Sequence, residues 1–353
     1  MRSSAAGAAT FERLSGAFRA ACAARPEEFV ERDYRIAGRP VRMRFAGRAL
    51  GDAYDRPLAH LRWPGRAETP DLVIDLWDEE ATGIGCEDCV EGSDPNAHGT
   101  VTVYDGARHV SQQSPCTLTV TDREASAKVG WVSSAARLTQ YELGRPLHSS
   151  LLLWMRDRGI QAVHAGLVAR DGAGVLFGGP GGSGKTTTAV TCLRAGYQYL
   201  ADDYVGLERL TDGTWFGHSL YSSSHFEPHH LQRFPDLLPH AMPGKLERED
   251  KHMVLLSGLF PEGFANGAAI RAVALPRVVP RVETRFRPAS KVAVLKQLAP
   301  SSLFQLPFLG AGRARFETMA ALVESVPTYW LELGSDLPGI PEAIGRMLRG
   351  EAE

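Results

Sequence analysis

Apolar and polar positions alternate differently in the two parts of this 353-residue chain. Over residues 1 to about 30, four apolar side chains recur at helical spacing and predict an amphipathic helix: Phe11, Leu14, Phe18 and Cys22. From about residue 32 to 132, short alternating runs stand between Gly, Asp and Pro turns, which predicts a β-rich region of about six strands. The runs are YRIAGRPVRMRFAG, DLVIDLWD, TVTVYDG, CTLTVTD and KVGWVS.

Helical patterns and apolar strands alternate in the second part of the chain. Residues 135–159 predict one helix with an apolar stripe. The segments VHAGLVAR and VLFGG, joined by a DGAG turn, predict a β-hairpin that enters a glycine-rich loop. A helix from Thr186 to Ala195, closed by Gly196, is expected next, followed by the strand YQYLA. Residues 215–265 give no clear assignment, and PEAIGRMLRG predicts a final amphipathic helix.

These patterns predict an α/β protein with two domains, in keeping with roughly 150 residues per domain. A β-rich α+β domain is expected over residues 1–133 and a second domain over residues 134–353. Hydrophobic residues make up 44% of the chain and charged residues 23%, so the chain can bury a sizeable core.

The charge balance argues against a general nucleic-acid partner. Acidic residues number 41 and basic residues 39, for a formal net charge of -2, whereas nucleic-acid binding depends on neutralising many phosphates. A local basic pocket for one phosphorylated ligand stays compatible with this balance. No apolar run approaches the roughly 18 residues of a membrane span, and Arg13, Arg19 and Arg25 interrupt any signal-peptide core. We therefore expect a cytoplasmic protein without a membrane partner.

The strongest motif is Gly179-Pro180-Gly181-Gly182-Ser183-Gly184-Lys185-Thr186, which matches the P-loop (Walker A) pattern G-x-x-x-x-G-K-[ST] and is followed by Thr187. Its glycines let the backbone wrap a phosphate chain, and the helix that follows offers its positive N-terminal end. Lys185 is placed to reach the β- and γ-phosphates, and the Thr186 hydroxyl is placed to bind Mg²⁺. The motif predicts that the chain binds a nucleoside triphosphate or another phosphate-rich ligand.

An acidic pair follows the next predicted strand. Asp202 and Asp203 come directly after YQYLA, which predicts that they lie at the carboxyl end of a strand beside the loop. One carboxylate there can hold Mg²⁺ and the other can take a proton from an attacking hydroxyl; an Asp-Asp dipeptide alone is more typical of a surface turn, but the preceding strand and the loop upstream favour the functional interpretation. His164 precedes the loop by one strand and, taken alone, is compatible with an ordinary structural histidine.

The segment HAGLVARDGAGVLFGGPGGSGKTTTAVTCLRAGYQYLADDYVGL resembles the catalytic domain of the HPr kinase/phosphorylase family. The resemblance covers residues 164–207 and implies an α/β, P-loop-containing, HPr kinase-like catalytic domain behind the β-rich domain. It implies ATP and Mg²⁺ as cofactors, Asp202 as the acid/base and Asp203 as the metal carboxylate, with the order of the two open to exchange. His164 would lie near the γ-phosphate or orient the acid/base.

Several further residues are weaker candidates. Lys251 is one of only six lysines and, by the same resemblance, would place a cation on the transferring phosphate. The other interpretation is a solvated surface lysine. Lys245 is the second candidate for the same role. The His-rich stretch HSLYSSSHFEPHH suggests a polar loop near the acceptor more than a metal site. Cys86 and Cys89 form a lone C-x-x-C in the polar stretch 83–99, which we expect to be a loop. Five arginines are strand-face charges by default, although one or two could bind phosphate: Arg271, Arg277, Arg281, Arg285 and Arg287.

The sequence thus predicts an ATP-dependent phosphotransferase acting on a hydroxyl, either a serine of a peptide or a small hydroxyl compound. The alternatives are a regulatory P-loop ATPase and a nucleotide-binding module without turnover. The family's Glu-x-Arg-Gly-type signature does not follow the Asp pair, and residues 1–130 do not match its N-terminal domain, so the acceptor, the reverse reaction, the choice of ATP or GTP and a homo-oligomeric state stay open. The N-terminal domain is the candidate for acceptor recognition.

Overall fold

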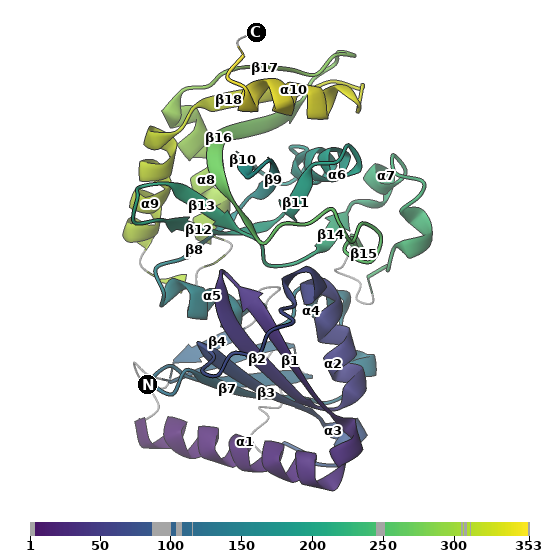
Figure 1. Cartoon of the computed structure of the whole chain (residues 1–353), viewed down its shortest axis with the longest axis vertical. Coiled ribbons are helices and arrows are strands. Elements are labelled where there is room, and N and C mark those ends of the chain that lie inside the picture. Colours follow the sequence, from purple (N-terminus) through teal and green to yellow (C-terminus); the bar gives the residue numbers. More distant parts are fainter. Residues whose placement is uncertain are drawn as a thin grey trace. The chain divides into compact units, whose positions relative to one another are not determined.

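The computed structural model describes residues 4–86, 100–103, 108–114, 116–244, 251–304, 306, 309–310 and 312–351. It is a mixed α/β structure with several sheets, and the chain divides into two compact units, Met1–Trp154 and Met155–Glu353 (Figure 1). No helix in the described part of the chain is both long and apolar enough to cross a membrane.

The first unit is built on one sheet. Its described strands pair in the order β1-β2-β3-β7-β6-β5-β4, in which β3 is parallel to both β2 and β7 and the remaining pairs are antiparallel. The bounds are β1 Phe29–Ile36, β2 Arg39–Ala46, β3 Leu72–Asp78, β4 Thr100–Val103, β5 Arg108–Ser114, β6 Thr117–Asp122 and β7 Ala127–Val132. Helices α1 (Ser4–Ala24), α2 (Arg48–Asp55) and α3 (Glu79–Thr82) and the 3₁₀ helices η1 (Pro26–Glu28) and η2 (Arg56–Leu61) complete this part.

Helix α1 confirms the prediction from the first apolar spacing. Leu14 and Phe18 are buried, and Phe11 and Cys22 pack against the same apolar cluster on one face of the sheet. The strand prediction needs two corrections. The run YRIAGRPVRMRFAG is a hairpin, because Ala37 and Gly38 both take positive φ and close a tight turn between β1 and β2. Strand β5 was missed because its sequence, RHVSQQS, is too polar to show the usual alternation.

The predicted single helix over residues 135–159 is wrong. The segment forms η3 (Ala135–Arg137), α4 (Gln140–Gly144) and α5 (His148–Arg156). Pro146 lacks the N–H that a continuing helix needs, and Leu147 takes a φ of 56°, so the chain breaks between α4 and α5.

The boundary between the units therefore differs from the predicted one after residue 133. Helices α4 and α5 belong largely to the first unit, because buried polar groups tie them to its sheet. The Thr117 hydroxyl donates to Glu142 at 2.9 Å, and the Lys128 ammonium donates to the Ser150 carbonyl at 2.9 Å. The chain passes to the second unit within α5, at Trp154 and Met155.

The second unit has a nine-stranded sheet over its described residues, centred on the long strand β16. Strand β10 lies parallel to β16 on one side, and on the other side β13 and β18 share its two halves. The strands are β8 Gln161–His164, β9 Gly166–Arg170, β10 Ala173–Phe177, β11 Gln198–Ala201, β12 Tyr204–Arg209, β13 Trp215–His218, β16 Gly267–Val278, β17 Arg285–Pro288 and β18 Thr328–Leu333. A separate two-stranded sheet pairs β14 (Ser223–Phe226) with β15 (His252–Leu255).

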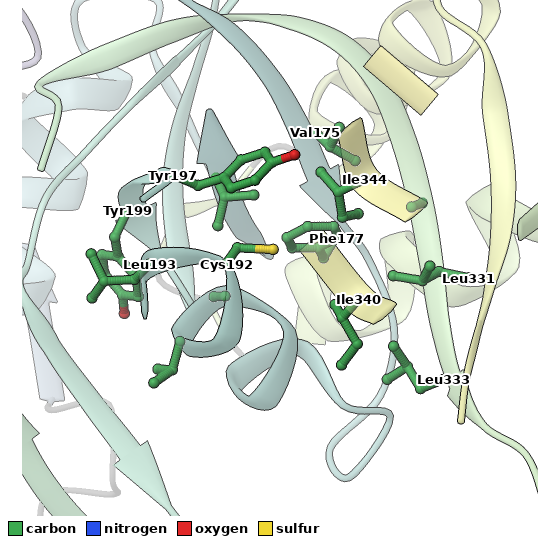
Figure 2. Packing of buried hydrophobic residues seen from close by; sticks show 14 of the residues in the cluster. Val175, Phe177, Cys192, Leu193, Tyr197, Tyr199, Leu331, Leu333, Ile340 and Ile344 are labelled. Carbon is green, nitrogen blue, oxygen red and sulfur yellow. The ribbon is translucent and has the colours of Figure 1, made fainter. Parts of the chain in front are cut away.

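Helices cover both faces of this sheet. On one face, apolar residues of α6 and α10 pack against Val175, Phe177, Leu331 and Leu333 of β10 and β18 (Figure 2). On the other face, residues of α8 and α9 pack against β16 and β9. The helices of this unit are α6 Lys185–Arg194, α7 Pro228–Leu231, η4 Leu238–His240, α8 Lys291–Phe304, α9 Gly312–Ser325 and α10 Gly339–Leu348.

The elements around the glycine-rich loop follow the sequence closely. Strands β9 and β10 form the predicted antiparallel hairpin, and α6 ends at Gly196, whose φ is 85°. The Tyr197 and Gly196 N–H groups donate to the carbonyls of Cys192 and Leu193, which is a Schellman ending. The segment VHAGLVAR is two strands, since the chain turns at Ala165, and β8 pairs with β12 instead of extending the hairpin.

Candidate functional site

The glycine-rich loop joins the carboxyl end of β10 to the first turn of α6. Gly179, Gly182 and Gly184 take φ values of 143°, 78° and 106°, a region that favours glycine. A Cβ on Gly184 would lie 2.3 Å from Cδ1 of Leu333, so the backbone there must also approach β18 closely. The loop therefore curves at the edge of the sheet, in front of the N-terminus of α6, where backbone N–H groups favour an anion.

Lys185 is buried in the loop, with 7% of its surface exposed. Its ammonium group donates to the carbonyls of Gly179 and Pro180 at 2.7 and 2.9 Å. Burial lowers the pKa of Lys185, and the nearby charges of Asp203 and Asp202 act against this shift. A cation held against neutral carbonyls in a poorly solvated loop is suited to meet phosphate oxygens.

The acidic pair lies between β11 and β12. Because β11 and β10 both run antiparallel to β9, they point the same way, and Asp202 and Asp203 lie at the edge of the sheet that carries the glycine-rich loop. Strand β9 passes close to the acidic pair: a Cβ on Gly166 would lie 3.5 Å from the Cα of Asp202, an ordinary van der Waals distance, and 3.3 Å from the ring of Phe177.

The two aspartates have different surroundings. Asp202 is 4% exposed, and its Oδ2 accepts a hydrogen bond from the Ser224 hydroxyl at 2.6 Å. The Tyr199 hydroxyl also hydrogen-bonds to Asp202, and burial, with Asp202 beside it, raises the pKa of Tyr199 well above its usual value. Asp203 has a side chain that is 24% exposed. The first carboxylate is enclosed by donors, and the second is open to a ligand.

His164 ends β8 and contacts the open carboxylate. Its Nε2 lies 2.5 Å from Oδ1 of Asp203, and its ring lies 5.5 Å from that of Tyr204. Because a carboxylate only accepts, this contact places a hydrogen on Nε2. The backbone adds a second link, since the Ala165 N–H donates to the Asp203 carbonyl at 2.9 Å.

Three supporting residues were missed by sequence reasoning: Tyr199, Ser224 and Ser302. Ser224 lies on β14, in the stretch that gave no assignment, and Ser302 of α8 accepts the His164 N–H at 3.0 Å. Tyr199 precedes the acidic pair in a predicted strand, so its position was visible but its hydroxyl partner was not. Serines scattered along the chain carry no local signal for such contacts.

Lys251 lies directly before β15, and its positive charge adds to the burial that lowers the pKa of Lys185. Its ammonium lies 3.7 Å from a carboxylate oxygen of Glu227, and both side chains are partly exposed. The fold thus brings Lys251 toward the glycine-rich loop across a long stretch of sequence. The runner-up, Lys245, lies outside the described residues.

The His-rich stretch forms secondary structure where a polar loop was expected. His218 ends β13 and pairs with Glu208 at 2.7 Å, His225 lies on β14, and His229 and His230 stack on α7 with ring centres 4.0 Å apart. Among the described residues, no group of three His, Cys, Asp or Glu side chains could hold a metal ion. Cys89 and most of the stretch 83–99 lie outside the described residues, so the C-x-x-C motif has no structural description.

The residues at the sheet edge fit Mg²⁺ in their chemistry. Thr186 opens the first turn of α6 with a hydroxyl, and Asp203 and Asp202 supply carboxylate oxygens at the same edge. Mg²⁺ prefers oxygen ligands and is commonly held by one or two protein groups together with phosphates and water.

The similarities of this chain to known proteins are to solved structures. No protein-family model matches the chain, and no curated protein matches it. Among solved structures, the HPr(Ser) kinase/phosphatase from Coxiella burnetii is similar at 14% sequence identity with a TM-score of 0.28. The match covers 54% of this chain and 95% of that chain.

Proposed function

We propose that this protein is an ATP-dependent phosphotransferase that moves the γ-phosphate to a hydroxyl group. The supporting observation is that the glycine-rich loop with its buried Lys185 and the acidic pair lie at the same edge of the sheet, after strands β10 and β11, which run the same way. A glycine-rich anion cradle beside a carboxylate pair is the arrangement that in-line phosphoryl transfer requires.

The loop and the two lysines would bind and neutralise the phosphates. Lys185 would leave the carbonyls of Gly179 and Pro180 for the β- and γ-phosphate oxygens, while the backbone N–H groups of Gly179 and of residues 181–187 hold the chain of phosphates in line. Lys251 would approach the transferring phosphate from the β15 side. Thr186 and a carboxylate of the pair would hold Mg²⁺, which supplies charge neutralisation between the phosphates when bound.

The surroundings of the two aspartates favour Asp203 as the proton acceptor. This exchanges the two roles that the family resemblance implies, in which Asp202 is the acid/base and Asp203 binds the metal. Asp202 accepts from Ser224 and Tyr199 and is buried, so it is less accessible to an acceptor hydroxyl than Asp203. Asp203 is partly exposed and oriented by His164. In the proposed step the acceptor O–H proton passes to Asp203, the hydroxyl oxygen bonds to the γ-phosphorus, and the bond to the β–γ bridging oxygen breaks to release ADP.

The first unit is proposed to select the acceptor. Strands β1 and β4 stand at the two ends of its described sheet order, and an extended peptide can bind to such an edge by strand addition. A peptide substrate needs contacts beyond its reacting hydroxyl, which this unit could supply.

The test of the proposed function is a screen for phosphate transfer with a matched pair of lysine variants. Wild-type protein is incubated with Mg·ATP and candidate peptides or hydroxyl compounds, and mass spectrometry follows the gain of one phosphate. We expect ATP consumption to rise with the right acceptor, to be lost in Lys185→Ala, and to persist in Lys296→Ala, which removes an exposed lysine of α8. Unchanged turnover in folded Lys185→Ala would refute the proposal, and acceptor-independent turnover would favour a regulatory ATPase.

A further inference from the structure

Arginines gather around one glutamate at the outer strands of the second unit. In the register of strands β16, β17 and β18, Arg277 of β16 and Arg285 of β17 both lie opposite Glu332 of β18, so the three side chains share one face. The Glu332 carboxylate contacts Arg277, lies 2.9 Å from Nε of Arg287 and lies 3.4 Å from a terminal nitrogen of Arg281. We call Arg277, Arg281, Arg287 and Glu332 the arginine cluster.

One carboxylate cannot satisfy three guanidinium groups. It has too few lone pairs for all their N–H donors, and Glu332 is itself only 8% exposed. The side chains of Arg281 and Arg287 are 59% and 56% exposed, and Nε of Arg277 is buried without a hydrogen-bond partner among the described residues. The cluster therefore keeps donors that a further oxyanion could use.

Positive charge also exceeds negative charge around the cluster. The neighbouring acids are Glu283, which pairs with Arg285 at 2.5 Å, and Asp336, which lies beside the turn. Four arginines thus face three carboxylates, and three of the arginines share Glu332 alone. The pKa of Glu332 is lowered by hydrogen bonds from Arg277 and Arg287, so this carboxylate stays ionised and holds the guanidinium groups in place.

The fold holds the cluster in a fixed geometry. The guanidinium carbon of Arg277 lies 4.7 Å from the centre of the Trp330 ring, which orients the side chain by a cation–π contact. The turn that carries Arg281 is fastened to the chain after β18, because the N–H groups of Ser335 and Asp336 donate to the carbonyls of Arg281 and Val282 at 2.9 Å. A Cβ on Gly334 would lie 2.1 Å from the Val282 carbonyl oxygen, so this approach requires glycine.

The cluster lies at the same edge of the sheet as the glycine-rich loop. Strands β10, β16 and β18 are parallel, so their carboxyl ends share that edge, where ligands of open α/β sheets bind. Gly184 of the loop approaches Leu333 and Pro276, and since side chains alternate along a strand, Glu332 and Arg277 lie at the same edge but on the opposite face, the face of Trp330. The acidic pair, in contrast, follows β11, on the other side of β10 in the strand order.

We infer that the arginine cluster is a second phosphate-binding site, separate from the glycine-rich loop. Arginine forks bind phosphate oxygens in pairs, and a bound phosphate would share the donors that Glu332 leaves open. The phosphate group belongs either to the donor nucleotide, on the side away from the acidic pair, or to a second molecule. The inference does not depend on the phosphotransferase activity, because the residues of the cluster are distinct from those of the loop.

The experiment titrates inorganic phosphate into the full chain by calorimetry. In Arg281→Gln/Arg287→Gln we expect the dissociation constant of the cluster site to rise at least tenfold. The matched control, Arg313→Gln/Arg349→Gln, removes the same charge from two exposed, ion-paired arginines and should change binding less than twofold. Lys185→Ala should retain the cluster site. Equal phosphate binding by the cluster variant and the control variant would overturn the inference.

A second titration identifies the source of the phosphate. Wild-type protein is first saturated with Mg²⁺ and a non-hydrolysable ATP analogue. If phosphate still binds to the saturated protein, and this binding is lost in the cluster variant Arg281→Gln/Arg287→Gln, the site serves a second molecule. If the analogue displaces all phosphate and the cluster variant binds the analogue at least tenfold more weakly, the site serves the nucleotide. If the analogue displaces all phosphate from the wild-type protein, and the cluster variant binds the analogue as tightly as wild type does, the result would contradict a second phosphate site.

Discussion

Ser224 donates its hydroxyl hydrogen to Oδ2 of Asp202 at 2.6 Å, whereas Oδ1 of the next residue, Asp203, lies 2.5 Å from Nε2 of His164. Two adjacent carboxylates therefore have different partners and different exposure. The two residues form the bend between β11 and β12, and their side chains reach different elements. Asp202 faces β14, and Asp203 faces the end of β8.

The first prediction separates the two aspartates. Asp203→Asn should still bind Mg·ATP but transfer phosphate at least about 10²-fold more slowly, the usual scale for losing a positioned proton acceptor. Asp202→Asn should instead raise the Mg²⁺ concentration needed for half-maximal rate. Rates measured against Mg²⁺ concentration distinguish the two. The opposite pattern would exchange the roles, and no effect in either variant would reduce the pair to a turn.

The second prediction concerns Ser224. Ser224→Ala removes a donor to Asp202 and leaves the contact between His164 and Asp203 in place, so its defect should follow that of Asp202→Asn in kind and be smaller. The same Mg²⁺ titration measures it. Ser257→Ala, which breaks the nearby contact with Ser222, is the control and should behave as wild type. A loss of rate at saturating Mg²⁺ would link Ser224 to proton transfer instead.

The third prediction is a proton uptake on nucleotide binding. Burial lowers the pKa of Lys185 in the ligand-free protein, and bound phosphates should raise it again. Between the lowered pKa and the usual value of 10.5, binding must therefore take up a proton, and affinity should fall as pH rises. Calorimetry in two buffers of different ionisation enthalpy measures the uptake. Lys185→Arg, whose guanidinium stays charged, should show none from this residue, and an equal uptake in both proteins would assign the proton elsewhere.

The fourth prediction concerns the close approach of the loop to β18. Gly184→Ala forces a side chain into a φ of 106° and places Cβ 2.3 Å from Leu333, so we expect a loss of about 2–4 kcal/mol in unfolding free energy together with weaker nucleotide binding. Denaturant unfolding measures the stability. Gly181→Ala is the control, because nothing lies within 4 Å of its added Cβ. Equal stability of the two variants would mean that the loop relaxes at little cost.

The fifth prediction tests the proposed role of the first unit. A fragment that begins at His148, so that α5 stays whole, should bind Mg·ATP with little loss and fail to phosphorylate the acceptor of the full chain. Binding and transfer are measured separately on the same preparation. Full transfer by the fragment would remove the acceptor role from the first unit. An insoluble or unfolded fragment would indicate that the unit serves to cover the second one, and would also count against selective acceptor recognition.

Local sequence determined the elements whose signals lie within a few residues. The glycine-rich loop, the hairpin of β9 and β10, the helix α6 with its Gly196 ending and the burial of Leu14 and Phe18 all follow from spacing and turn chemistry. Those signals are local because a turn or a helix cap is decided by adjacent backbone angles. The same reasoning failed for the helix over residues 135–159, where Pro146 and the positive φ of Leu147 divide an otherwise continuous apolar stripe.

Tertiary structure decided which distant residues meet. Ser224 reaches Asp202, Ser302 accepts from His164, and Lys251 comes within electrostatic range of Lys185, because β14, β15 and α8 pack against the elements that carry the loop and the acidic pair. The same holds for Arg277, Arg281 and Arg287, whose common partner Glu332 lies on another strand. No pattern within a short window encodes such pairs, since their free energy depends on strand order and register. The sequence alone therefore predicted a phosphate-binding loop and an acidic pair, and the fold gave each carboxylate its own partner.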